Sequence, residues 1–127
     1  LSRGNLILWA KGALEKQSPI NVVDDQFRSP TLSEDLAKGC ISIVDKEAKG
    51  IYHLSGPITY SILEIVERIG KFYKLSTECV TPIKTATLNQ EAARPPRTGF
   101  IIDKAKKELD YSPKTLEESL EFLDNQI

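Results

Sequence analysis

The feature that most constrains the fold is an alternation of helix-type and strand-type segments along the chain. Residues 4–17 carry apolar side chains at helical spacing, and residues 20–23 (INVV) are rich in the β-branched residues typical of strands. The alternation returns twice, with strand-like runs at residues 51–54 (IYHL) and 78–83 (ECVTPI), each preceded by a helical pattern. The predicted order is α-β-α-β-α-β-loop-α-α, an α/β fold with a parallel or mixed sheet and helices packed against it.

Capping residues mark where the predicted helices begin. Asn5 is the expected N-cap of the first helix, and Asp103 is expected to cap a short helix that ends at Leu109. Residues 84–99 keep no periodicity and are predicted to form the longest irregular segment. Three Ser/Thr–Glu pairs have the spacing of a capping box: Thr31 with Glu34, Ser61 with Glu64, and Thr115 with Glu118.

Length and composition are those of an ordinary globular chain. The 127 residues carry a net charge of −1, which gives no reason to expect a nucleic acid or a membrane as partner. We expect one compact unit over residues 1–127 of a cytoplasmic protein.

The second helical pattern includes Cys40, and the last strand-like run includes Cys79. Both cysteines are interpreted as reduced core thiols.

The sequence contains few groups that could carry catalysis. It has no GxGxxG and no GxxxxGK[ST] loop, and its one histidine, His53, falls in a strand-like run where a structural role is expected. Asp24 and Asp25 follow the first strand, and turn chemistry is favoured over a metal site for this pair. No metal is expected.

Several hydrogen-bond donors lie on loops, and loops at the carboxyl ends of strands are where α/β proteins bind ligands. Arginine on such a loop suits a diphosphate because its guanidinium group is a rigid bidentate fork, although a solvated surface arginine is the alternative. These loop-borne candidates are Asn5, Gln26, Arg28, Arg94 and Arg97.

Four motifs, in order, resemble the C-terminal half of an extended short-chain dehydrogenase, and within that superfamily the dTDP-4-dehydrorhamnose reductase family. The resemblance covers the chain from about Gly4 to Leu123. The most diagnostic pair is DDQFRSPT with ARP. The motifs are VVDDQFRSPTLSEDLAKG, GIYHLSG, YSILEIVERIGK and AARPPRTGFIIDKAKKELDYSPKTLEESL.

The resemblance implies a two-part enzyme of the NAD-dependent epimerase/dehydratase superfamily. Its N-terminal Rossmann part would bind NADPH or NADH and carry a Tyr-x-x-x-Lys catalytic pair, and its C-terminal part would bind a dTDP-sugar. No tyrosine of this chain has a lysine four residues later, and the chain has no methionine even at position 1. We therefore expect a fragment that contains no catalytic residue, binds no cofactor and is inactive alone. Without the missing N-terminal part, it is expected to self-associate.

The resemblance also implies roles for particular residues. Arg28 stands where extended family members place an arginine that meets the nucleotide diphosphate, and Arg94 stands where the reductases hold the substrate nucleotide. Asn5 and Gln26 match positions that face the sugar nucleotide, with cap and loop hydrogen bonding as the alternative for both.

Two departures from the reductase pattern keep other functions open. Reductases often carry a glycine where Arg28 stands, and the RPPRTGF run differs from their usual RPxxS. The alternatives are part of another nucleotide-sugar epimerase or dehydratase, or a non-catalytic regulatory binding subunit of the same fold family.

Overall fold

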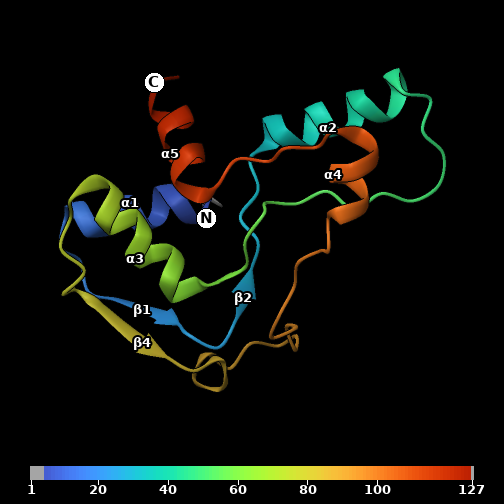
Figure 1. The fold of residues 1–127 in the computed structure, drawn as a ribbon. Coiled ribbons are helices and arrows are strands. Elements are labelled where there is room, and N and C mark those ends of the chain that lie inside the picture. Colours follow the sequence, from blue (N-terminus) through green and yellow to red (C-terminus); the bar gives the residue numbers. More distant parts are fainter. Residues whose placement is uncertain (1–4, 127) are drawn as a thin grey trace. The chain divides into compact units, whose positions relative to one another are not determined.

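The computed structural model describes residues 5–126, which form a mixed α/β structure (Figure 1). Contacts within the chain divide it into two compact units, and each unit combines two separate stretches. Among the described residues, unit 1 contains residues 5–27 and 60–97, and unit 2 contains residues 28–59 and 98–126. The expectation of one compact unit stays a prediction, so each unit is described separately.

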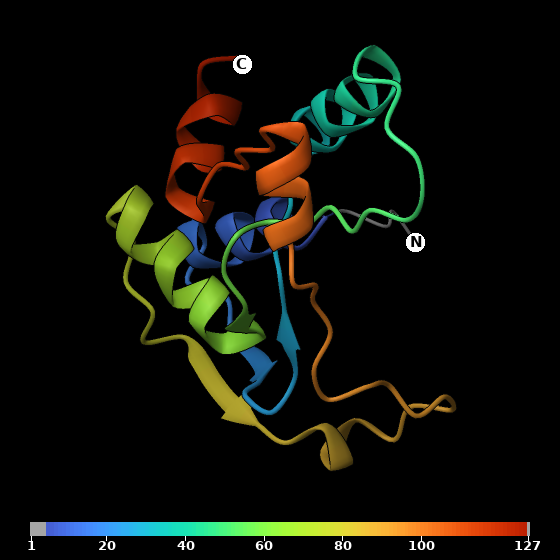
Figure 2. The same ribbon diagram turned by 45° about the vertical axis from the view of Figure 1, so that its right-hand side comes forward.

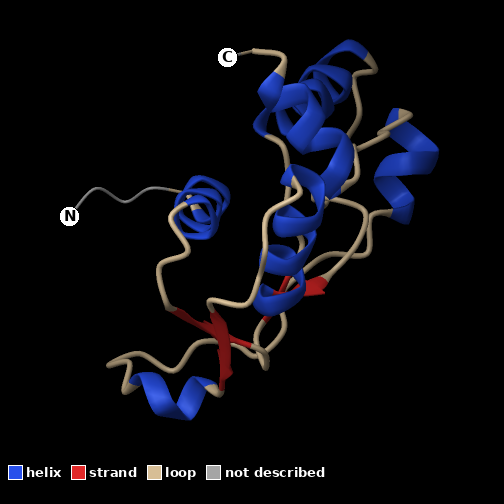
Figure 3. Ribbon diagram, turned by 90° about the vertical axis from the view of Figure 1, so that its left-hand side faces the viewer, coloured by secondary structure: helices blue, strands red, loops and turns tan. Residues whose placement is uncertain are grey.

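Unit 1 is built on a pair of parallel strands, drawn in red in Figure 3. Strand β1 (Ile20–Val23) pairs with β4 (Val80–Ile83), with Ile20 opposite Val80 and Val23 opposite Ile83. Helix α3 (Ile62–Tyr73) contacts β1 and also helix α1 (Leu6–Glu15). Its buried stripe, formed by Ile65, Val66 and Ile69, supplies much of the core of this unit.

The described chain also contains two very short strands and one 3₁₀ turn. A 3₁₀ turn, η1 (Thr85–Leu88), follows β4. Strands β2 (Phe27–Arg28) and β3 (Tyr60–Ser61) form a second two-stranded sheet, and β2 is visible beyond the end of β1 in Figure 2. Because β1 leads into a polar turn and then β2, the residues Asp24–Gln26 lie between two strands and not at the start of a helix.

Unit 2 contains helices α2 (Ser33–Asp45), α4 (Asp103–Leu109) and α5 (Leu116–Asp124). Helix α2 contacts α4. A buried cluster formed by Ile102, Ala105, Leu109 and Tyr111 is the core around α4. Apolar side chains from the other stretch of the unit, residues 28–59, pack against it. The Tyr111 hydroxyl donates to the Ser55 carbonyl oxygen at 3.0 Å, which fixes the segment after α4 against residue 55.

Most predicted elements are confirmed, together with three of the predicted helix starts. The Asn5 Oδ1 atom accepts from the Leu8 N–H at 2.9 Å, so Asn5 is the N-cap of α1. The Ser61–Glu64 and Thr115–Glu118 pairs both form complete capping boxes. Strand predictions hold for residues 20–23 and, within the run 78–83, for residues 80–83.

Three local predictions are wrong. Helix α2 begins at Ser33 after Leu32, without a side-chain cap, because the Thr31 hydroxyl donates to the Ser29 carbonyl and accepts from the Gly56 N–H. Residues 51–54 form no strand, so His53 lies in a loop. Helix α4 does end at Leu109, but Asp103 is its first residue and the N-cap is Ile102.

Leu36, Ala37, Cys40, Ile41 and Val44 recur at helical spacing and predict an apolar stripe on α2, but the buried face of this helix is a different one. Leu36, Ile41 and Val44 are exposed, whereas Asp35 and Gly39 are buried. Cys40 is also exposed, so its prediction as a core thiol is wrong; Cys79 is half-buried, and both thiols are free. Every helix within residues 5–126 is too short or too polar to cross a membrane.

Candidate functional site

The polar turn after β1 is tied to the segment after β4. The Asp25 carboxylate accepts from the Thr85 backbone N–H at 3.0 and 3.1 Å and from the Thr85 hydroxyl at 2.6 Å. The neighbouring Asp24 carboxylate pairs with the Lys84 ammonium group at 2.7 Å. These contacts give both carboxylates a role in the turn, as predicted.

The charges of this turn respond to the same contacts. The hydrogen bond from the Thr85 hydroxyl lowers the pKa of Asp25, and the hydrogen bond to Asp24 raises the pKa of Lys84. Both shifts favour the charged forms, so the turn holds its ion pair and its hydrogen bonds at neutral pH. Within residues 5–126 no cluster of three or more His, Cys, Asp or Glu side chains could hold a metal ion.

Gln26 belongs to the same network. The residue is 7% exposed, and its Nε2 atom donates to the Thr85 hydroxyl at 3.1 Å. The amide therefore has a structural partner in unit 1, which fits the alternative of loop hydrogen bonding. A contact from Gln26 to a sugar nucleotide stays a prediction.

Arg28 lines a hollow of about 510 Å³ in unit 2. Pockets for small molecules fall in the range of about 300–1,000 Å³, so a hollow of this size can accept part or all of a nucleotide. Its lining combines hydroxyl groups with apolar side chains: Arg28, Ser29, Thr31, Leu54, Ser55, and residues 98–100. The Ser29 and Thr59 hydroxyls share a hydrogen bond of 2.8 Å beside it.

Asn5 and Arg94, the remaining predicted residues, belong to unit 1 and are exposed. The Asn5 side chain is used as the cap of α1. Arg94 lies in the irregular segment shortly before Pro96, whose carbonyl accepts from the Phe27 N–H at 2.7 Å. The Arg97 guanidinium carbon is 5.3 Å from the centre of the Phe27 ring, so this end of the Arg94 segment is held beside β2.

Sequence reasoning missed Phe100. Its ring lines the Arg28 hollow and stacks on His53, with ring centres 4.9 Å apart and an interplanar angle of 10°. The only signal in the sequence is an aromatic residue directly after Gly99, the last residue of the predicted irregular segment. His53 therefore has a structural contact in unit 2, which fits the structural role expected for it. The residue lies in a loop and not in the predicted strand.

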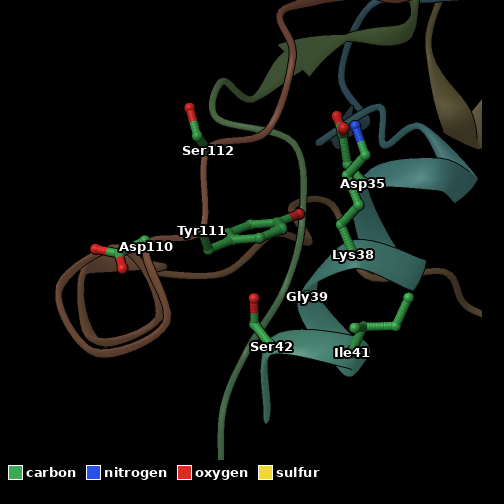
Figure 4. A pocket seen from close by; sticks show the side chains of 8 residues that line it. All are labelled: Asp35, Lys38, Gly39, Ile41, Ser42, Asp110, Tyr111 and Ser112. Atoms are coloured by element: carbon green, nitrogen blue, oxygen red, sulfur yellow. The ribbon is translucent and has the colours of Figure 1, made fainter. Parts of the chain in front are cut away.

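A second hollow of about 450 Å³ lies between α2 and the residues after α4 (Figure 4). Its two carboxylates already have partners in unit 2. The Asp35 carboxylate accepts from the Lys114 N–H at 2.7 Å and pairs with the Lys114 ammonium group at 3.1 Å, and Asp110 pairs with Lys46. Burial raises the pKa of Tyr111, which keeps this phenol neutral as a donor. These contacts stabilise the unit.

Comparison with known proteins shows that residues 3–126 match the model of the family described as RmlD substrate binding domain. A probable low-salt glycan biosynthesis reductase, Agl14, of Haloferax volcanii is 22% identical over 116 residues, which cover 91% of this chain and 39% of that protein.

Solved structures with a similar fold include two dTDP-4-dehydrorhamnose reductases. A dTDP-4-dehydrorhamnose reductase from Bacillus anthracis, solved with NADP, matches with a TM-score of 0.85 and 24% identity, over 100% of this chain and 45% of that one. A Clostridium acetobutylicum dTDP-4-dehydrorhamnose reductase matches with a TM-score of 0.82 and 21% identity, over 98% and 45% of the two chains. The chain thus spans less than half the length of these relatives, and the likeness confirms the predicted α/β fold class.

Proposed function

We propose that this chain, which belongs to the RmlD substrate binding domain family, is the nucleotide-sugar-binding part of a dTDP-4-dehydrorhamnose reductase. The parent enzyme would reduce dTDP-4-dehydro-L-rhamnose to dTDP-L-rhamnose with NADPH or NADH, a reaction of polysaccharide biosynthesis. The observation that carries the proposal is the family match over residues 3–126, nearly the whole chain.

The strand connections of this chain support substrate binding over dinucleotide binding. Neither β1 nor β4 leads through a glycine-rich turn into an α-helix: β1 is followed by a polar turn and β2, and β4 by η1. The sequence also has no Tyr-x-x-x-Lys pair. We therefore assign substrate binding to this chain, and nicotinamide binding and catalysis to an N-terminal Rossmann part. The isolated chain should reduce no dTDP-4-keto sugar.

Arginine chemistry supports the substrate class. A dTDP-sugar carries two phosphates, and guanidinium groups recognise phosphate oxygens through paired, charge-assisted hydrogen bonds. Arg28 lines a hollow with hydroxyl groups beside it, and Arg94 lies exposed on an anchored loop. The proposal includes a cytoplasmic location, in keeping with the free thiols of Cys40 and Cys79.

One observation favours a second candidate. Arg28 stands where the resemblance leads us to expect a glycine in many reductases, which favours part of a nucleotide-sugar epimerase or dehydratase. The two candidates share the ligand class and differ in the reaction. A UDP-sugar substrate, and preferential binding of UDP over dTDP, would favour this second candidate.

Ligand binding to the 127-residue chain tests the proposal. We expect dTDP to raise the melting temperature of the wild type. Arg94→Ala should weaken dTDP binding by about ten- to a hundredfold, because it removes a charged hydrogen-bond donor worth roughly 1.5–3 kcal/mol. Lys49→Ala, an exposed cation outside both arginine segments, is the control and should bind as the wild type does. Equal dTDP affinity in Arg94→Ala and Lys49→Ala would contradict the role of Arg94, and measurable reduction of a dTDP-4-keto sugar would contradict the proposed division of labour.

A further inference from the structure

Phe100 is an exposed aromatic residue that is nevertheless held in place. The residue is 58% exposed, yet its ring stacks almost parallel on His53. The ring also lines the hollow that contains Arg28. Exposed, ordered aromatic rings beside a cationic group are typical of surfaces that bind nucleotides through stacking.

The backbone at Gly99 explains why Phe100 and Arg28 share one hollow. Gly99 has φ of +151°, a conformation that residues with a side chain rarely adopt. A Cβ atom at this position would lie 2.6 Å from the Ser29 Oγ atom and 3.1 Å from the Thr59 Oγ1 atom. Segment 98–100 therefore lies directly against the residue that follows Arg28, within unit 2.

We propose that Phe100 provides a stacking surface for the base of a nucleoside diphosphate whose phosphates meet Arg28. This inference rests on the proposed nucleotide-sugar function and assigns the two ends of the ligand within one hollow. His53 is a positioning residue, because its ring fixes the orientation of the Phe100 ring. Stacking depends on the π-face that every base has, so Phe100 contributes affinity without selecting thymine over uracil.

The test uses calorimetric titration of the 127-residue chain with dTDP, UDP and inorganic pyrophosphate, the last being a probe without a base. We expect Phe100→Leu to weaken dTDP and UDP binding by similar factors of about tenfold, or about 1.4 kcal/mol, and to leave pyrophosphate binding unchanged. Arg28→Ala should weaken all three ligands. Phe100→Tyr keeps a stacking ring and should retain affinity, and Ile101→Ala, an exposed neighbour, is the matched control.

The outcomes separate this inference from the proposed function. If Phe100→Leu binds dTDP as the wild type does while Arg28→Ala binds it weakly, the stacking role is overturned and the nucleotide site stands. If Phe100→Leu loses pyrophosphate as well, the ring only maintains the shape of the hollow and the stacking role is again overturned. If the wild type binds neither dTDP nor UDP, both the proposed function and this inference fail.

Discussion

Asp35 is a buried carboxylate that stabilises unit 2 although it lies far from Lys114 in the sequence. It is 3% exposed and accepts hydrogen bonds from both the backbone and the side chain of Lys114. A buried charge is tolerated only when such partners offset the cost of removing it from water. Because both bonds end on a single carboxylate, one substitution is enough to test the whole contact.

We expect Asp35→Asn to lower the free energy of unfolding by about 2 kcal/mol, since it weakens charged hydrogen bonds to a partly buried ammonium group. Urea denaturation followed by circular dichroism measures this change. Asp110→Asn is the control, because the Asp110 side chain in its pair with Lys46 is mostly exposed, and it should leave unfolding almost unchanged. Equal effects of the two substitutions would contradict the structural role of Asp35.

Gly56 gives a second prediction at the level of single residues. A Cβ atom there would lie 1.8 Å from the Pro30 carbonyl oxygen, a backbone atom that cannot rotate away. We expect Gly56→Ala to lower the free energy of unfolding by about 3 kcal/mol, as overpacking does when the backbone must shift. Gly12→Ala is the matched control: that glycine lies within α1 with open space around it, so alanine should stabilise the helix by about 0.5–1 kcal/mol. Thermal unfolding of both variants measures the contrast, and a Gly56→Ala variant as stable as the wild type would contradict it.

At the scale of elements, the contact between the β1 turn and η1 predicts a pH dependence. The Thr85 hydroxyl lowers the pKa of Asp25 in the folded state. The resulting stabilisation is fully present above about pH 4, the pKa range of an unfolded aspartate, and is lost as the pH falls through the lower folded pKa. Thr85→Val removes the hydroxyl and keeps the shape of the side chain. We expect the wild type to exceed this variant in stability at pH 7 and the difference to narrow below about pH 4, as measured by urea unfolding at several pH values. A difference independent of pH would contradict the assignment to Asp25.

Elements whose signals are local could be predicted from the sequence. Ser61 and Thr115 each cap a helix together with a glutamate three residues later, and both capping boxes form. Thr31 carries the same local signal, but its hydroxyl is taken by Ser29 and Gly56, and the second of these partners is distant in the sequence. A local sequence pattern gives no information about a competing partner that is distant in the sequence.

The buried face of α2 could not be predicted for a related reason. Periodicity groups Leu36, Ile41 and Val44 on one stripe, but the face that packs within unit 2 is the one that carries Asp35 and Gly39. The partner of Asp35 comes from the last stretch of the chain. The same limit applies to the candidate site. Arg28 could be predicted from its motif, whereas Phe100 becomes a candidate only through its stack on His53 and its place in the hollow that Arg28 also lines.

At the scale of the whole molecule, the exposed stripe of α2 supports the predicted self-association. Ile41 and Val44 are 59% and 75% exposed, which leaves large apolar side chains in water on one helix. We expect light scattering of the wild type to show a mass that rises with concentration, and Ile41→Glu to reduce that rise. Lys38→Glu, an exposed position on the same helix, is the control for added negative charge. A wild type that stays monomeric at high concentration would contradict the prediction.

The interleaved composition of the two units has a consequence for synthesis. Residues 60–97 complete unit 1 before residues 98–126 exist, so the stretch 28–59 leaves the ribosome without the stretch that shares its core. At translation rates of about 5–20 residues per second, several seconds pass between the synthesis of residues 28–59 and that of residues 98–126. During this interval the partners of Asp35, Ser55 and Leu54 have not yet been synthesised, so the contacts that bury these residues cannot form.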